Sequence, residues 1–188
     1  MSQPTLKTTR LILRPFQKDD APSVQLLAGD WDIADTTLNI PHPYENGMAE
    51  QWIETHEAAY EAATLAVFAV VLRDNKRLIG AVGLTVDRSL NKANLGYWIG
   101  KPYWNSGYAT EAARAVIAAG FDELDLNRIY ASHFARNPSS GRVMEKLGML
   151  LEGRARQDTM KWGKYEDMVS YGLLREDWVR NQQSRKNS

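Results

Sequence analysis

The spacing of apolar residues divides the chain into an N-terminal part with short helices and a longer part in which strands and helices alternate. Residues 9–16 alternate apolar and polar side chains, which predicts a first strand. Asp19 or Asp20 can cap a short helix that ends near Gly29, and residues 31–40 predict a second short helix. The start of the chain is therefore predicted to contain one strand followed by small helices.

A rigid loop and a longer helix come next. Two prolines within residues 41–44 exclude regular structure in that segment. Asn46 can cap the helix that follows, because Met48 and Trp52 begin an apolar face at helical spacing.

The apolar pattern changes at Leu65. Residues 65–72 form a nearly continuous apolar run, which is typical of a strand buried on both faces. Turn signals at residues 74–76 and 90–91 separate this run from the strand-like segments 78–86 and 93–99. Three successive strands joined by short turns predict an antiparallel meander.

A strand–helix–strand unit follows the meander. Small apolar residues predict a helix over 107–121, and residues 128–134 predict the next strand. A crossover of that length requires this strand to be parallel to 93–99, with a right-handed connection. Pro138 is placed to begin another helix, and Gly148 is placed just past its end.

Two last strands, at about 150–158 and 165–174, are joined by a turn at residues 162–164. Residues 181–188 are polar, and we expect them to be disordered. Because the chain shows neither an internal repeat nor a linker, residues 1–180 are predicted to form a single mixed α/β domain.

The composition excludes several classes of function. Among 188 residues, 23 basic and 23 acidic side chains cancel, so no net charge draws the protein to nucleic acid or to an anionic membrane. No apolar run approaches the roughly 18 residues of a membrane span, and the N-terminus lacks a signal-peptide core. The chain has no cysteine, and His42, His56 and His133 lack ligand spacing, so we expect no metal. A cytoplasmic location is the expectation.

Residues 104–112 carry the clearest candidate chemistry. Gly107 and the small Ala109 lie between a strand-like run and a helix, so that helix can begin with its backbone N–H groups uncovered. Such an end carries roughly half a positive charge and suits a phosphate group. A glycine loop before a helix is a weak signal when taken alone, because glycine also simply eases a loop.

Four stretches, taken in order, strengthen that interpretation. They are residues 9–14, 96–100, 103–112 and 137–148. Together they resemble the GNAT superfamily of acetyl-CoA-dependent N-acetyltransferases and, within it, the ribosomal-protein N-terminal acetyltransferases. The ending 163–178 is similar to that branch as well, and the resemblance covers roughly residues 8 to 178.

The resemblance implies a GNAT-like fold, which is a mostly antiparallel sheet of about six to seven strands with one splayed parallel pair and helices on both faces. It implies acetyl-CoA as co-substrate in the cleft at the splay, with the pyrophosphate on backbone N–H groups and the pantetheine arm along the strand edge. The residues that the resemblance implies as cofactor contacts are Tyr97, Trp98, Ile99, Asn105, Ser106, Gly107, Tyr108, Ala109, Thr110, Asn137, Ser140 and Arg142.

The resemblance also assigns roles to residues near the splay. Ser140 matches a serine that contacts or protonates the departing thiolate, although a serine in a first helical turn also satisfies a backbone N–H. Asn137 matches a residue that bonds the pantetheine amides, and a plain helix N-cap explains it equally well. Met144 stands where many members carry a tyrosine acting as general acid, and Asn94 where an acidic residue often occurs. Neither position supplies a conventional acid or base.

The remaining polar residues near the cleft have simpler interpretations. Arg142 and Lys146 can reach phosphates, but a solvated helix face explains both. Glu111 complements the helix dipole better than it serves as a base. His133 is expected to be a hydrogen-bonded strand residue.

Acetyl transfer to an amine asks little of side chains. A free α-amino group has a pKa near about 8, so a useful fraction is neutral at pH 7. A backbone N–H near Ile99 can support the thioester carbonyl, and holding both reactants in line contributes most. A missing conventional base therefore does not exclude catalysis.

The acceptor side is expected to be built by the N-terminal helices and the 41–44 loop. Asp30, Asp32 and Asp35 can attract a cationic amine there, although an exposed helix face explains the same charges. The leading hypothesis is acetylation of a protein or peptide N-terminus. A small-molecule amine, a non-catalytic acetyl-CoA-binding module and a nucleotide-binding domain are alternatives, and a homodimer is plausible from the family.

Overall fold

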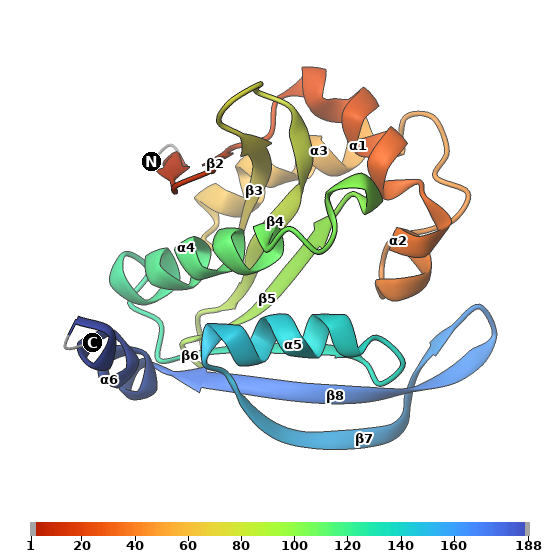
Figure 1. The fold of residues 1–188 in the computed structure, drawn as a ribbon. Coiled ribbons are helices and arrows are strands. Elements are labelled where there is room, and N and C mark those ends of the chain that lie inside the picture. The colour runs from red at the N-terminus through yellow and green to blue at the C-terminus, as the bar shows by residue number, and fades with distance from the viewer. Residues whose placement is uncertain (1–2, 187–188) are drawn as a thin grey trace.

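Within residues 3–186, the part of the chain that this computed structural model describes, eight strands pair into one sheet in the order β1-β2-β3-β4-β5-β6-β8-β7 (Figure 1). The strands are β1 (Leu6–Lys7), β2 (Leu11–Arg14), β3 (Leu65–Leu72), β4 (Leu78–Asp87), β5 (Lys92–Ile99), β6 (Arg128–Phe134), β7 (Leu150–Lys161) and β8 (Lys164–Leu174). The α-helices are α1 (Ala21–Ala28), α2 (Trp31–Thr36), α3 (Met48–Glu61), α4 (Tyr108–Asp122), α5 (Pro138–Leu147) and α6 (Arg175–Lys186). None of these helices is both long and apolar enough to cross a lipid bilayer.

The only parallel neighbours among the described strands are β5 and β6, and they pair along only part of their length. Pairing begins with Lys92 opposite Arg128 and ends with Asn94 opposite Tyr130, while both strands run on. The prediction of a splayed parallel pair within a mostly antiparallel sheet is therefore confirmed. The sheet has one more strand than the six to seven expected, because the two-residue β1 extends its edge.

Helices cover both faces of the sheet, as expected. On one face α4 and α5 pack against the centre of the sheet, and on the other face α1 and α3 pack against β3 and β4 (Figure 1). Gly120 lets α4 approach the sheet closely, since a Cβ there would lie 2.8 Å from Leu84 Cδ1 and 2.9 Å from Ile129 Cδ1. This tight packing fixes the direction of α4 and hence the position of its N-terminus.

Two predicted helix ends are wrong. The helix predicted over 31–40 ends at Thr36, where the hydroxyls of Thr36 and Thr37 bond back to the carbonyls of Asp32 and Ile33. The helix expected to be capped by Asn46 has Gly47 at its N-cap instead. The side chain of Asn46 accepts a hydrogen bond from Gln25 in α1.

The polar C-terminal segment also differs from expectation. Residues 181–186 continue α6 instead of forming a disordered tail, and residues 187–188 lie outside the described residues. Trp178 anchors this helix, because its buried ring stacks on Phe121 of α4 with ring centroids 5.9 Å apart. Arg175 adds hydrogen bonds to the carbonyls of Phe121 and Leu126.

Candidate active site at the opened parallel pair

The gap between β5 and β6 exposes main-chain groups of β5. The N–H of Gly100 donates to the carbonyl of Ile79 in the neighbouring strand β4, which sets the alternation of hydrogen bonds between β4 and β5. In that alternation Tyr97 and Ile99 point their N–H and C=O groups away from β4 and into the gap. The indole of Trp104 donates to the Ile99 carbonyl. The Ile99 N–H and both main-chain groups of Tyr97 form an edge that an extended, amide-rich molecule can pair with.

The N-terminus of α4 opens beside this edge. Its N-cap, Gly107, has φ 78°, a left-handed conformation that strains most residues with a side chain. Because glycine has no side chain, it offers no capping acceptor to the first-turn N–H groups of Tyr108, Ala109 and Thr110. The first intrahelical bond runs from the Glu111 N–H to the Gly107 carbonyl, at 3.0 Å. The result is a cluster of main-chain donors at the positive end of a helix.

The carboxylate of Glu111, in the first turn of α4, joins this loop to the segment between β1 and β2. It accepts hydrogen bonds from the Thr8 hydroxyl at 2.7 Å and from the Arg10 backbone and guanidinium at 2.8 Å and 2.7 Å. Arg10 also donates to the Ser106 carbonyl and lies 4.5 Å from the centre of the Tyr108 ring. Burial would raise the pKa of Glu111, but these hydrogen bonds and the Arg10 charge hold the pKa below its usual value. Glu111 is a bonded anion that holds the loop in place.

Tyr97 and Ser140 meet across the gap. The Tyr97 hydroxyl lies 2.8 Å from Ser140 Oγ and 3.1 Å from the Ser140 carbonyl oxygen, so it joins β5 to the first turn of α5. Burial raises the pKa of Tyr97 to about 12, and the hydrogen bond with Ser140 opposes part of that rise. Tyr97 is therefore a neutral phenol at physiological pH, and it orients the serine hydroxyl.

The residues named from the sequence converge on one cavity. This first cleft, of about 470 Å³, lies between the start of α4, α5 and the free edge of β5. Of the predicted contacts it is lined by Tyr97, Trp98, Ile99, Asn105, Gly107, Tyr108, Ala109, Thr110, Asn137, Ser140 and Arg142. Ser106 does not line the cleft, because its carbonyl is turned toward Arg10 and its hydroxyl bonds the Trp104 carbonyl.

A second cleft, of about 560 Å³, lies on the side of α1, α3 and the 37–44 segment. The two clefts share the lining residues Thr36, Thr37, Tyr97, Trp98 and Ser140. A molecule in one cleft can therefore reach a molecule in the other beside the Tyr97–Ser140 pair.

Asn137 and Arg142 both line the first cleft, and their partners in the structure are protein groups. Asn137 occupies the N-cap of α5 without a capping bond from its side chain, and its amide donates to the Thr36 carbonyl at 3.5 Å. The backbone of Asn137 thus forms the cap while its side chain reaches toward the shared wall. Arg142 donates to the hydroxyl of Ser139 at 2.8 Å.

Met144 and Asn94 supply neither an acid nor a base near Ser140, whereas His133 is an imidazole that lines the second cleft. Met144 is buried and lines the second cleft, so no tyrosine stands there. Asn94 lies exposed on β5 and lines the same cleft. His133 bonds the Phe134 carbonyl through Nδ1, but its buried Nε2 has no partner among the described residues. The expectation of a fully bonded histidine is therefore wrong for that nitrogen.

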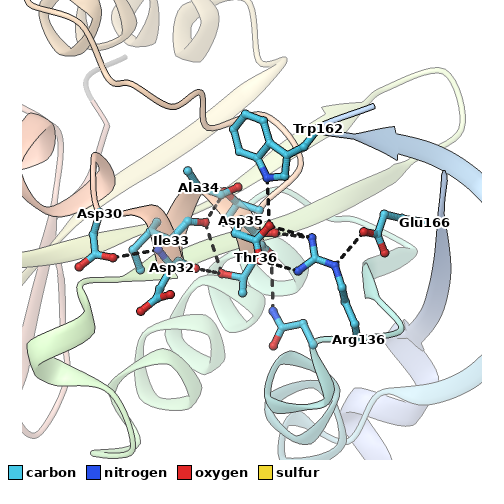
Figure 2. A network of polar contacts seen from close by, with 11 residues as sticks. Asp30, Asp32, Ile33, Ala34, Asp35, Thr36, Arg136, Trp162 and Glu166 are labelled. Atoms are coloured by element: carbon cyan, nitrogen blue, oxygen red, sulfur yellow. Dashed lines mark hydrogen bonds and ion pairs between the residues drawn. The ribbon is translucent and has the colours of Figure 1, made fainter. Parts of the chain in front are cut away.

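The three aspartates of α2 are occupied by protein partners. Asp30 caps the helix by accepting from the Asp32 N–H, and Asp32 pairs with Lys101. Asp35 accepts from Arg136 at 2.7 Å and from the indole of Trp162 at 2.9 Å (Figure 2). The structure therefore differs from both expectations, because these partly buried carboxylates are neither a simple exposed helix face nor unpaired charges open to a cationic amine.

Sequence reasoning missed the part of the site formed by the end of α2 and by Arg136. Thr36 and Thr37 line both clefts, and Arg136 lies between Asp35 of α2 and Glu166 of β8 (Figure 2). Because Arg136 immediately precedes Asn137 in the sequence, its place beside the first cleft could have been predicted. The threonines carried no signal, because only the fold brings α2 to the gap.

Comparison with known proteins supports this arrangement. A family model described as "Acetyltransferase (GNAT) domain" matches residues 10–150. The chain is 31% identical over 173 residues to the uncharacterized N-acetyltransferase YnaD of Bacillus subtilis (strain 168), covering 92% of this chain and 98% of that one. It is also 31% identical over 108 residues to the ribosomal protein uS5-alanine N-acetyltransferase of Escherichia coli (strain K12), over 56% of each chain.

Solved structures agree with the fold. A GNAT-family acetyltransferase from Bacillus anthracis superposes with a TM-score of 0.82 at 28% identity, covering 92% of this chain and 99% of that one. The ribosomal L7/L12 alpha-N-protein acetyltransferase RimL, solved in complex with coenzyme A, superposes with a TM-score of 0.83 at 15% identity, covering 91% and 98%. With the family match, the opened parallel pair and the uncapped start of α4 in view, this chain belongs to the GNAT family of acetyltransferases.

Proposed function

We propose that the protein transfers the acetyl group of acetyl-CoA to a primary amine by direct attack in a ternary complex, and that the amine is the N-terminus of a protein or peptide. The observation that carries the proposal is the meeting of two clefts at Tyr97 and Ser140. One cleft has the features of a diphosphate and amide-arm site, and the other leaves room for an acceptor.

The first cleft fits acetyl-CoA on its own chemistry. The uncapped N–H groups of Tyr108, Ala109 and Thr110 would hold the pyrophosphate, and the free edge of β5 at Tyr97 and Ile99 would pair with the pantetheine amides. Gly107 has no side chain that could cap those N–H groups in place of a ligand.

Acetyl-CoA would supply an acyl carbon activated as a thioester. In the transfer, the neutral amine nitrogen forms a bond to that carbon and the carbon–sulfur bond breaks with its electron pair on sulfur. The proton that the amine gives up ends on that sulfur, so the products are the acetylated amine and coenzyme A. In this proposal the Ser140 hydroxyl donates a hydrogen bond to the departing sulfur, and its contact with the Tyr97 hydroxyl supports that role by holding the serine in orientation. The Ile99 N–H points into the gap and can donate to the carbonyl oxygen.

Relatives support the N-terminal acceptor. The Escherichia coli relative acts on an alanine of ribosomal protein uS5, and the coenzyme A complex is that of an alpha-N-protein acetyltransferase. A small-molecule amine is the alternative within the same chemistry. Met144 and Asn94 favour, as a second candidate, a module that binds acetyl-CoA without turning it over.

Initial rates of coenzyme A release, measured against a panel of peptides and small amines, test the proposal. We expect intersecting double-reciprocal lines and a preference for peptides. Ser140→Ala should lower kcat about tenfold, as expected when one hydrogen bond to a charged leaving group is lost. Ser89→Ala, in the β4–β5 turn, is the matched control and should leave the rate unchanged.

Parallel double-reciprocal lines would contradict direct attack. Tight binding of acetyl-CoA with no release of coenzyme A for any acceptor, and no effect of Ser140→Ala, would favour the non-catalytic module.

A further inference from the structure

The second cleft has no charged wall. Among the described residues that line it, none is Asp, Glu, Lys or Arg. A charge buried in such a cavity without a partner loses hydration that nothing replaces. The cleft therefore disfavours any acceptor that must place a charged group inside it, whatever the sign of that charge.

Carboxylates on the bordering helix α2 do not change this picture. Figure 2 shows Asp35 between the guanidinium of Arg136 and the indole of Trp162. Asp32 is paired with Lys101 and Asp30 with the Asp32 backbone. Each negative charge of α2 is held by a protein group, so it does not offer an unpaired anion to an ammonium group of the acceptor.

Cations near the cleft are held in the same way. Arg136 donates to Asp35 and also to Glu166 at 2.8 Å. Lys161, at the tip of the β7–β8 hairpin, donates to the carbonyls of Leu38 and Ile40 at 3.2 Å and 2.9 Å. Neither cation is placed to receive the carboxylate of a free amino acid inside the cleft.

The walls combine apolar side chains with hydroxyl and amide groups and one imidazole, that of His133. Trp52, Tyr44 and Met48 come from the α3 side, and Trp98 comes from β5. Met168 closes the β8 side. Aromatic and methionine side chains suit an apolar group of adaptable shape.

From this geometry we infer that the acceptor is the α-amine of a peptide whose first residue is uncharged and apolar, and that polyamines and free amino acids are poor acceptors. The inference rests on the proposed function and narrows its acceptor. A polyamine carries a second ammonium and a free amino acid carries a carboxylate, whereas a peptide N-terminus carries neither. Its α-amine, with a pKa near about 8 against about 10.4 for a lysine-like amine, is also more often neutral and ready to attack.

Matched peptides that differ only in the first residue test this inference. We expect kcat/KM for a first Leu or Met to exceed that for a first Asp or Lys by at least about tenfold, the cost of one unpaired charge in an uncharged cavity. Leucine amide should be acetylated faster than free leucine by a similar factor, because the amide removes the carboxylate. Spermidine serves as the polyamine probe and should be the poorest acceptor.

A negative charge placed in the wall of the second cleft should shift the preference toward peptides whose first residue is a cation. Asn39 lies exposed in the wall, so Asn39→Asp adds a carboxylate with little change of shape. The ratio of kcat/KM for first-Lys over first-Leu peptides should rise about threefold or more, and added salt should reduce that gain. Asn75→Asp, in the β3–β4 turn, is the control and should leave the ratio unchanged, since either side chain can accept from the Arg77 N–H.

Binding of the same peptides to the protein saturated with coenzyme A, followed by calorimetry, separates the two proposals. If no peptide or amine releases coenzyme A, the proposed function fails, yet tighter binding of first-Leu than of first-Lys peptides would still support the inference. Equal or better use of charged first residues, of spermidine or of free leucine, by rate or by binding, would overturn it.

Discussion

The first cleft is built mainly from main-chain groups, whereas the second cleft is built from side chains of distant segments. On one side, the N–H groups at the start of α4 and the free edge of β5 define the surface. On the other side, α1 and α3 each contribute two side chains, and the 37–44 segment and the sheet contribute most of the rest. Main-chain recognition requires a backbone conformation, and side-chain recognition requires that segments far apart in sequence be held together.

The two sides are also secured differently. The loop before α4 is held by hydrogen bonds and an ion pair that join Glu111 to Thr8 and Arg10, near the start of the chain. The wall of the second cleft depends on the tip of the β7–β8 hairpin, where Trp162 stacks on Trp31 with ring centroids 5.0 Å apart. The comparison teaches that the donors of the cofactor side come from one loop and one strand edge, whereas the walls of the acceptor side come from many segments.

Low pH should destabilise the acceptor side, which includes α3, and this is the largest effect expected. His56 is buried against the rings of Trp52 and Phe16, with neither ring nitrogen bonded among the described residues. Burial lowers its pKa from 6.5 to about 4. Between these values the unfolded chain binds a proton that the folded chain does not. The free energy of unfolding should therefore fall by up to about 3 kcal/mol as the pH drops through that window.

Urea unfolding at several pH values between 7 and 4 measures this change. His56→Phe should remove most of the slope, whereas His42→Gln, at an exposed loop position, should retain it. If the free energy of unfolding of His56→Phe fell with pH as steeply as that of the unchanged protein, other groups would control acid stability. The two clefts would then not differ in their sensitivity to acid.

A carboxylate at the start of α4 should disable the cofactor side alone. Gly107→Asp places an anion at the N-cap, where it would accept from the uncovered N–H groups and repel a diphosphate. We expect the Kd for coenzyme A to rise about a hundredfold. Gly107→Asn is the matched control, since both residues tolerate the left-handed φ and only one carries charge. For Gly107→Asn, the Kd for coenzyme A should rise about tenfold, measured by calorimetry. Equal losses for the two variants would place the diphosphate elsewhere.

Removing the hairpin contact should affect the acceptor side alone. Trp162→Ala loses the stack on Trp31 and the bond to Asp35, so the free energy of unfolding should fall by about 1–2 kcal/mol. The KM for the peptide should rise severalfold while the Kd for coenzyme A stays unchanged, because Trp162 lines neither cleft. Trp162→Phe should recover part of the loss through stacking. A change in coenzyme A affinity of the same size would contradict the independence of the two sides.

The smallest effect is expected at the boundary that both sides share. Tyr97→Phe leaves the ring in place and removes the hydroxyl that orients Ser140. We expect kcat to fall about threefold to tenfold, the usual worth of one hydrogen bond, with little change in either KM. Because the pKa of Tyr97 is raised to about 12, its ionisation should leave no inflection in the pH–rate profile between pH 7 and 10. An inflection that disappears in Tyr97→Phe would assign the tyrosine a proton-transfer role.

Sequence patterns predicted the central elements well, because their signals are local. The bounds of β3, β6 and α5 agree with the apolar runs and with the Pro138 and Gly148 positions at the ends of α5. Predictions failed where a side chain had a better partner far away. Asn46 bonds Gln25 instead of capping α3, and Trp178 holds the polar end of the chain as a helix.

By itself, the sequence determined the meander, the parallel crossover and the glycine-opened start of α4, since each depends on residues that are neighbours along the chain. Only the tertiary structure decided that Tyr97 meets Ser140, that two clefts share their wall, and that every carboxylate of α2 is held by a protein group. Those features join residues as far apart as Asp35 and Trp162, and long-range contacts of that kind follow from packing, which no local pattern encodes.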